Sequence, residues 1–306
     1  MILNPGALAA LGTALAWTLT SVCFEYAAKR IGALVLNLLR LLVAFVFLGV
    51  YGLAARGLFL PVDAPASAWL LLGASGLVGF VIGDLALFQA FVDIGSRLSM
   101  LVYATAPIFT AVLGFAAFGE RIGILGVLGM CLTLAGIALA VLGRKGGPGQ
   151  TVPSRRGRGL VLAVIAALGQ AGGLVLGKLG ARAGTGTGER AMDPFAGTQA
   201  RVVAGILGFA IVVTAARSWK GVGAGLKDGK ALLSLGAGAF FGPFLGVSLS
   251  LLAVQMGNTG IASAIMSIVP VLIIAPSALI LKERISVREV AAAFAAVGGV
   301  FLLFLA

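Results

Sequence analysis

The chain has 306 residues, of which 60% are hydrophobic and only 10% are charged, and its mean hydropathy is +1.13. A soluble domain carries about 25% charged residues, so this composition excludes a water-soluble fold and predicts an integral membrane protein. The net charge of +12 does not indicate nucleic-acid binding, because the basic residues lie between apolar runs, as expected for loops facing anionic lipid. The chain contains no histidine, which excludes a histidine proton relay or metal site.

Ten apolar runs of about 20 residues, the length that spans a bilayer, follow one another along the chain: 7–27, 33–55, 68–91, 98–118, 123–142, 158–179, 195–216, 231–254, 261–281 and 287–305. The segment 143–157 is rich in Gly, Pro and Arg and separates five runs from five. We therefore expect an all-α membrane protein with ten transmembrane helices. Its domains are a five-helix repeat at 1–142, a basic linker at 143–157 and a second five-helix repeat at 158–306.

The two halves repeat one pattern. ATAPIFTAVLGFAAFGERI (104–122) and SIVPVLIIAPSALILKERI (267–285) both hold a proline near the start and Glu-Arg at the end. Their prolines, Pro107 and Pro270, are 163 positions apart. The same offset relates the glycine pairs 79/242, 83/246 and 136/299, and a slightly different offset relates Arg40 to Arg201. Because each half has an odd number of spans, the second half must be inverted relative to the first, as in many secondary transporters.

This pattern resembles the drug/metabolite transporter superfamily, and the EamA group of exporters in particular. The resemblance is carried by A-P-I-F-T…G-E-R-I followed by Gly129 and Gly136, and by V-P-V-L…K-E-R-I followed by Gly298 and Gly299. It implies export of small metabolites, often amino acids, from the bacterial cytoplasm. Members elsewhere in the superfamily carry nucleotide sugars or phosphorylated sugars, so the resemblance does not fix the substrate.

The expected substrate cavity combines aromatic and polar side chains from several spans. Four-residue spacing places Phe80, Asp84 and Phe88 on one face of the third span, and Trp17 and Ser21 on one face of the first. Aromatic rings flanking a deep carboxylate suit an amine-bearing or zwitterionic ligand. The alternative is that Asp84 pairs structurally with an arginine or a backbone amide.

Two further cavity candidates, Tyr103 and Gln170, complete this set. Tyr103 lies one turn before a proline, and Gln170 is the repeat counterpart of the tryptophan in the first span. Such polar groups either bond between helices or line a path.

Four charged residues within or at the ends of spans are candidates for charge pairing. Glu25 either pairs with Lys29 at the interface or forms a gate with its repeat counterpart Lys178. Arg40 and Arg201 either anchor helices or grip a carboxylate.

Prolines are expected to interrupt the fourth, eighth and ninth spans, at Pro107, Pro243 and Pro270. A proline half-way along a membrane helix removes a backbone hydrogen bond, and the freed carbonyl needs another partner. Each proline is therefore either a static kink or part of a cavity wall that moves.

The orientation in the membrane stays open. With both termini in the cytoplasm, as the resemblance implies, the cytoplasmic loops would hold four arginines and the opposite loops 15 basic residues. This contradicts the positive-inside rule, so the charge distribution favours both termini outside.

We predict a secondary transporter in the bacterial inner membrane that exports amino acids or similar small metabolites by alternating access. The chain contains no P-loop pattern, so ATP drive is not expected. The expected partners are a small-molecule substrate, protons if transport is coupled to them, and the lipid bilayer, with the chain a monomer or weak homodimer and without cofactor, metal or catalytic residue. The alternatives are a nucleotide-sugar or sugar-phosphate exchanger, a cationic drug exporter and, more remotely, an intramembrane enzyme.

Overall fold

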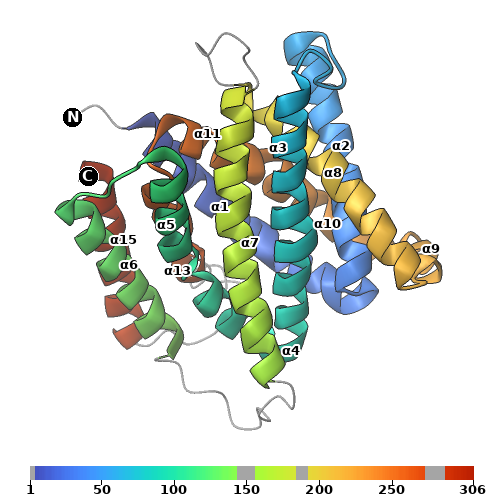
Figure 1. Cartoon of the computed structure of the whole chain (residues 1–306). Helices are drawn as coiled ribbons and strands as arrows, with labels where there is room; N and C mark the ends of the chain where they lie inside the picture. The colour runs from blue at the N-terminus through green and yellow to red at the C-terminus, as the bar shows by residue number, and fades with distance from the viewer. Residues whose placement is uncertain (1–3, 143–155, 184–191, 273–286) are drawn as a thin grey trace.

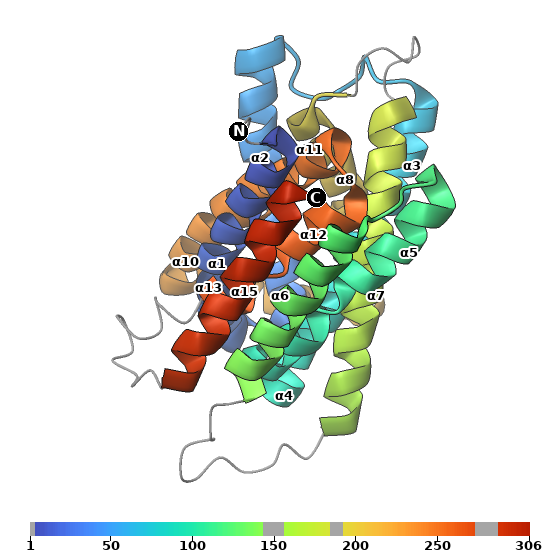
Figure 2. The same ribbon diagram turned by 90° about the vertical axis from the view of Figure 1, so that its left-hand side faces the viewer.

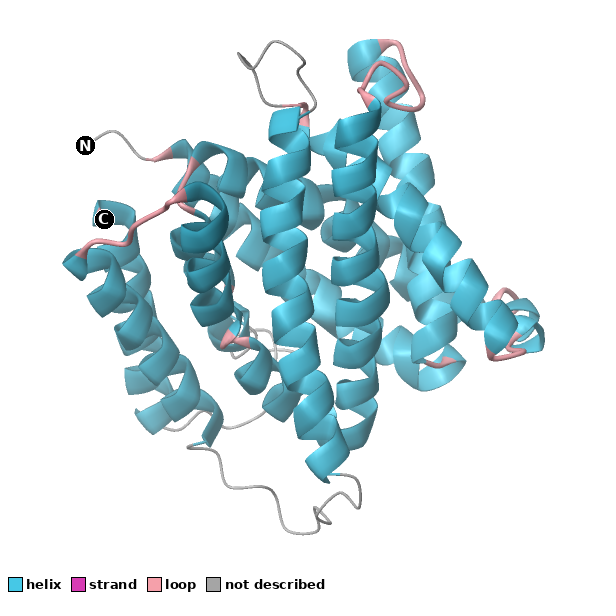
Figure 3. Cartoon of the chain, in the orientation of Figure 1, coloured by secondary structure: helices cyan, strands magenta, loops and turns pink. Residues whose placement is uncertain are grey.

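The computed structural model describes residues 4–142, 156–183, 192–272 and 287–306 (Figure 1). Most of the predicted linker and the second Glu-Arg pair, at 283 and 284, lie outside these ranges. All regular secondary structure within them is helical (Figure 3), and two segments, η1 and η2, are π-helical.

The first half contains six α-helices and one π-helical segment: α1 (Pro5–Ile31), α2 (Ala33–Arg56), α3 (Ala66–Gly76), η1 (Leu77–Asp84), α4 (Leu85–Tyr103), α5 (Ala106–Phe118) and α6 (Ile124–Leu142). The described part of the second half contains α7 (Arg156–Ala183), α8 (Pro194–Ala215), α9 (Trp219–Gly225), α10 (Gly229–Ala239), η2 (Phe240–Gly246), α11 (Val247–Met256), α12 (Thr259–Met266), α13 (Val269–Leu272) and α15 (Val287–Leu305).

Seven helical stretches in the described ranges are long and apolar enough to cross a membrane: Pro5–Ile31, Ala33–Arg56, Ala66–Ile94, Leu98–Phe118, Arg156–Ala183, Pro194–Ala215 and Gly229–Met256. Three shorter apolar helices lie where the fifth, ninth and tenth spans are predicted, at Ile124–Leu139, Thr259–Leu272 and Val290–Leu305. The all-helical membrane fold is thus confirmed, whereas the number of ten spans stays a prediction. One expected loop is absent from the described chain, since α4 continues as helix through 92–97.

Corresponding helices of the two halves run in opposite directions. In Figure 1, α1 runs away from the end of the molecule that carries both termini, whereas α7 runs toward it. The same reversal relates α2 to α8 and α6 to α15. Figure 2 shows α6 and α15 lying side by side along one flank of the bundle, where the glycines at 136 and 299 each face the backbone of the other helix.

Side-chain caps start helices in both halves. The Asn4 side chain accepts a hydrogen bond from the Gly6 N–H at 3.0 Å, and Pro5 takes the first helical position of α1. Asp193 caps α8 in the same way, accepting from the Ala196 N–H at 2.9 Å. Asn-Pro and Asp-Pro therefore act as start signals, because the cap satisfies a free N–H and proline has none to satisfy.

The two halves also share their irregularities. The π-helical segments begin at Leu77 and Phe240, which are 163 positions apart. A two-residue turn separates α4 from α5 and a matching turn separates α12 from α13, again at this offset. Since π-helical turns are frequent at functional sites, the duplicated segments mark the part of the fold where a site is sought.

Pro107 and Pro270 do not sit half-way along a continuous helix, which corrects the expected position. The helix is interrupted just before each of them, so that Pro107 lies in the first turn of α5 and Pro270 is the second residue of α13. At a helix start the missing N–H needs no partner and the ring meets no preceding turn. Each of the two prolines therefore begins a new helix and does not kink a continuous one.

Pro243 lies inside a helical stretch, within η2. In a π-helix the N–H of residue 243 would bond to the carbonyl five residues earlier, that of Gly238. Proline has no N–H, and the Thr20 hydroxyl donates to the Gly238 carbonyl instead, at 3.2 Å. A side chain of the first half thus bonds to the backbone of the second half beside the proline.

The first helix of each half packs on the π-helical segment of the other half, α1 on η2 and α7 on η1. Glycines permit this close approach, with Gly169 lying against Gly83 and Gly173 against Gly79. The two repeats are therefore interlocked, and the space between the four elements belongs to both.

Candidate functional site

A cavity lies where helices of both halves meet. It is bounded by α1, α2, η1 and α4 of the first half and by α7, α8, η2, α11 and α13 of the second. The volume of the cavity is about 90 Å³. Aromatic and aliphatic side chains form most of its wall, with a few polar groups among them, which is the usual character of a small-molecule site.

All seven residues predicted for the substrate cavity line this space: Trp17, Ser21, Phe80, Asp84, Phe88, Tyr103 and Gln170. Pro243, Arg40 and Arg201 line it as well. Pro107, Pro270, Glu25 and Lys178 are not among its lining residues.

Asp84 is paired with an arginine of the chain itself. Arg40 Nη2 donates to Asp84 Oδ2 at 2.5 Å, and the Arg40 side chain is only 4% exposed. A second hydrogen bond, from Arg40 Nε to Asn37 Oδ1 at 3.0 Å, fixes the orientation of the guanidinium. The sequence left open whether Asp84 faces a ligand or pairs with an arginine, and the structure shows the ion pair with Arg40.

Three phenylalanines surround this guanidinium. The Arg40 Cζ atom lies 5.5 Å from the ring centre of Phe24, 5.8 Å from that of Phe80 and 5.2 Å from that of Phe88. This is the arrangement in which aromatic rings stabilise a cation. The expected cage for a ligand's amine is therefore filled by a cation of the protein.

Arg201 differs from Arg40 although it lines the same cavity. Its side chain is buried, and within the described part of the chain its Nε and Nη1 atoms have no hydrogen-bond partner. The contact the structure provides is with Phe80, whose ring centre lies 5.1 Å from the Arg201 Cζ atom. Phe80 consequently faces two guanidinium groups, one paired with a carboxylate and one unpaired.

Lys178 does not meet Glu25, which corrects the expected gate. Glu25 instead accepts a hydrogen bond from Lys29 at 2.7 Å, the interfacial alternative. Lys178 is 3% exposed and donates to Glu120 Oε1 at 2.5 Å and to the Gly257 carbonyl at 2.7 Å.

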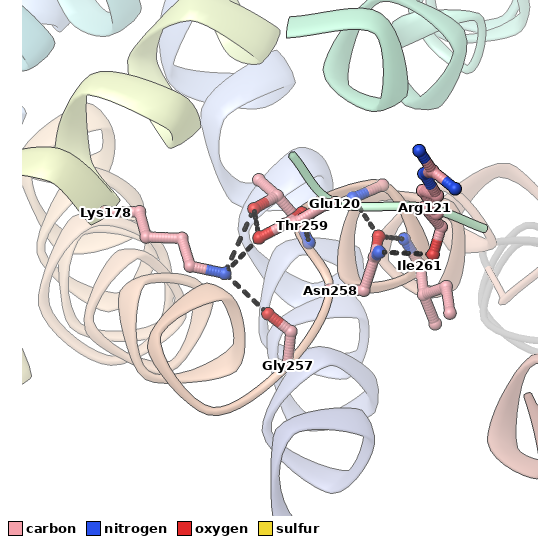
Figure 4. Close-up of polar contacts among 8 residues, drawn as sticks. Glu120, Arg121, Lys178, Gly257, Asn258, Thr259 and Ile261 are labelled. Carbon is pink, nitrogen blue, oxygen red and sulfur yellow. Dashed lines mark hydrogen bonds and ion pairs between the residues drawn. The ribbon is translucent and has the colours of Figure 1, made fainter. Parts of the chain in front are cut away.

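Glu120 joins both halves at the end of the molecule that carries the termini (Figure 4). Besides the lysine, it accepts from the Thr259 N–H at 2.7 Å and from the Thr259 hydroxyl at 3.0 Å. The neighbouring Asn258 side chain donates to the Arg121 carbonyl at 3.4 Å. We call Glu120, Lys178 and Thr259 the terminal-end clasp. It ties the loop after α5 to α7 and to the start of α12.

Some cavity residues were not predicted. Thr20, Phe24, Leu174 and Ser250 also contribute to the wall. Thr20 and Phe24 lie three and seven positions after Trp17, on the same face of α1, so helical spacing alone could have added both. The repeated Glu-Arg pair marks Glu120 in the sequence as a residue at a helix end, but its lysine partner left no signal, because it comes from another span.

The resemblance seen in the sequence is confirmed by comparison with known proteins. The EamA-like transporter family matches residues 4–142 and again residues 157–305. The chain belongs to the EamA-like transporter family. No curated protein sequence gives a significant match.

Among solved structures, 29 chains match this member of the EamA-like family. One of them, described only as the crystal structure of a protein, is 17% identical with a TM-score of 0.71, covering 97% of this chain and 95% of its own. At this identity the likeness shows the fold alone. Family membership makes the chain a multi-pass membrane protein of a transporter family.

Proposed function

We propose that the chain is a secondary transporter of the bacterial inner membrane that exports amino acids or similar small metabolites by alternating access. The observation that carries this proposal is the cavity shared between two inverted halves and bounded by both π-helical segments. Transporters built from inverted repeats bind substrate between the repeats, at irregular helices, and expose the site to each side in turn.

The terminal-end clasp supports alternating access. Its ion pair joins α7 of the second half to the loop after α5 of the first half, at one end of the bundle. A buried pair of this kind is strong only while its geometry is complete. A small displacement of one half against the other therefore releases it, which suits a gate.

The cavity favours amino acids and related compounds over the alternatives. Its one described carboxylate, Asp84, is already paired with Arg40, which disfavours a cationic drug. A phosphate monoester carries about −1.5 to −2 charge at pH 7 and the pyrophosphate of a nucleotide sugar carries about two negative charges, whereas Arg201 is the one unpaired cation among the described lining residues. A nucleotide sugar or sugar phosphate therefore finds less compensation than a molecule with one negative group.

Counterflow into proteoliposomes tests the proposal. Vesicles with the purified protein are loaded with an unlabelled compound, and uptake of its labelled form is measured with and without a pH gradient. We expect uptake of at least one amino acid above protein-free vesicles, with nucleotide sugars and cationic drugs at background. Uptake confined to nucleotide sugars or to cations would replace the proposed substrate class, and no uptake from the whole panel would contradict export.

A further inference from the structure

We infer that Arg201 is the binding residue for a carboxylate group on the transported molecule, so that the substrates are small carboxylates with an apolar part. The inference rests on the proposed transport function and narrows its substrate class. It is carried by one juxtaposition, a buried arginine with unsatisfied N–H groups in the wall of the shared cavity.

Within the described residues, Arg201 is near the Asp84 carboxylate, but that carboxylate is bonded to Arg40 and not to Arg201. Neither an ion pair nor a hydrogen bond joins the Arg201 guanidinium to the described residues, and two of its nitrogen atoms are fully buried without a partner. Such a group is costly, because burial removes water and nothing replaces its hydrogen bonds. The unsatisfied N–H groups of Arg201 are explained if a bound anion in the cavity accepts their hydrogen bonds.

The internal repeat shows why the partner is missing. Arg40 of the first half has Asp84, and the residue 163 positions after Asp84 is Val247. Val247 also lines the cavity. The second half thus keeps the arginine and replaces its carboxylate with an apolar side chain, which leaves one positive charge for a ligand.

Small residues surround the Arg201 guanidinium in the cavity wall. It lies beside Gly79 and Gly177, and a side-chain carbon added to Gly79 would come within 3.3 Å of Arg201 Nη2. The Phe80 ring centre lies 5.1 Å from Arg201 Cζ, and Nε and Nη1 have no hydrogen-bond partner among the described residues. A planar guanidinium with unused N–H groups matches the two oxygens of a carboxylate.

The charge count favours a carboxylate over other ligands. A single unpaired guanidinium balances one negative charge, whereas an ammonium group meets a carboxylate that is already engaged by Arg40. The rings of Trp17, Phe24 and Phe88 provide an apolar wall nearby for the remainder of the molecule. Amino acids fit through their carboxylate, and so do the corresponding acids without an amine.

Ligand binding to the purified protein tests the inference apart from transport. The probes are phenylalanine, 3-phenylpropionate and phenethylamine, which share one ring and differ in their charged groups, with the matching leucine and tryptophan series. Binding is measured as the shift of the thermal unfolding midpoint in detergent. We expect shifts with the amino acids and the acids and none with the amines. Shifts with amines only, or with no carboxylate, would overturn the inference.

Two variants with matched controls assign the effect to Arg201. Arg201→Gln should weaken carboxylate binding about tenfold to a hundredfold without lowering the unfolding midpoint of the ligand-free protein. The exposed Arg217→Gln controls for the loss of charge. Val247→Asp should supply the missing carboxylate, abolish binding and unfold at a higher temperature than Val247→Asn. A purely structural arginine predicts the opposite, a lower midpoint for Arg201→Gln with binding unchanged.

Transport and binding can fail separately. Binding that depends on Arg201 without counterflow would leave the carboxylate site standing and remove the export function. Counterflow of phenethylamine but not of 3-phenylpropionate would leave the transporter standing and remove the carboxylate site.

Discussion

The two halves of the chain place an arginine at corresponding points, but only the first half supplies it with a carboxylate. Arg40 is bonded to Asp84 and Asn37 and enclosed by aromatic rings, whereas Arg201 contacts the Phe80 ring and has no ion pair or hydrogen bond with the described residues. The backbone around the two is alike, with a π-helical segment in each half. Duplication has therefore produced a symmetric scaffold with an asymmetric charge distribution. We interpret the paired arginine as structural and the unpaired one as available to a ligand.

The largest effect should come from breaking the paired arginine. Arg40→Gln leaves the Asp84 carboxylate in a buried site without its partner, and removing one member of a buried pair costs about 3–5 kcal/mol. Arg201→Gln strands no carboxylate of the chain and should cost far less. Thermal unfolding of both variants in one detergent measures the difference. Equal losses would show that the two arginines play the same structural part.

Much of this architecture could be predicted from the sequence. The apolar runs, the offset of 163 and the position of the cavity residues all follow from spacing along single helices, because helical periodicity determines which residues share a face. Trp17 and Ser21, and Phe80, Asp84 and Phe88, were found in this way.

Contacts between spans could not be predicted, because helical spacing does not report which helix faces which. Glu120 and Lys178 come from different halves, and nothing in either local pattern marks the pair. The position of the Arg40 guanidinium among the three phenylalanine rings could not be predicted for the same reason, because Arg40 and the rings come from different helices.

The terminal-end clasp should give the next largest effect. Lys178→Met removes a charged hydrogen bond to Glu120 and another to the Gly257 carbonyl, and hydrogen bonds to charged groups contribute about 1.5–3 kcal/mol each. We expect a loss of about 3 kcal/mol, the lower end of the sum of the two bonds, because Glu120 keeps its two bonds to Thr259. We also expect a change in counterflow rate. Thr259→Val, which keeps the ion pair, is the matched control and should change both less. Unaltered counterflow in Lys178→Met, with the protein folded, would argue against a gating part for the clasp.

A glycine pair compares the packing of the two π-helical segments. A side-chain carbon at Gly246 would meet the Trp17 ring at 2.7 Å, whereas one at Gly83 would meet Gly169 at 3.4 Å. Gly246→Ala should therefore cost about 1–2 kcal/mol through overpacking and weaken ligand binding by displacing Trp17. Gly83→Ala should be tolerated better. Unfolding midpoints and binding of the two variants decide this, and a greater loss in Gly83→Ala would contradict the packing described here.

The smallest effect concerns the proline that only one half possesses. Pro243 corresponds to Phe80 at the offset of 163, and η1 is π-helical without any proline. The proline is thus not the cause of the π-helix in η2. It does remove one N–H, and the Thr20 hydroxyl occupies the carbonyl left free at Gly238. Thr20→Ala should consequently cost about 1 kcal/mol, the contribution of one hydrogen bond.

The same substitution should cost less once residue 243 can donate. In Pro243→Ala the backbone N–H returns and can bond to the Gly238 carbonyl, so Thr20→Ala then removes a redundant donor. A double-mutant cycle measured by thermal unfolding gives the coupling directly, because residues that share a hydrogen-bond acceptor are not additive. Additive losses would show that Thr20 and Pro243 act independently. A coupling of the expected sign would show that the first half completes the backbone of the second at a point where the repeats differ by a proline.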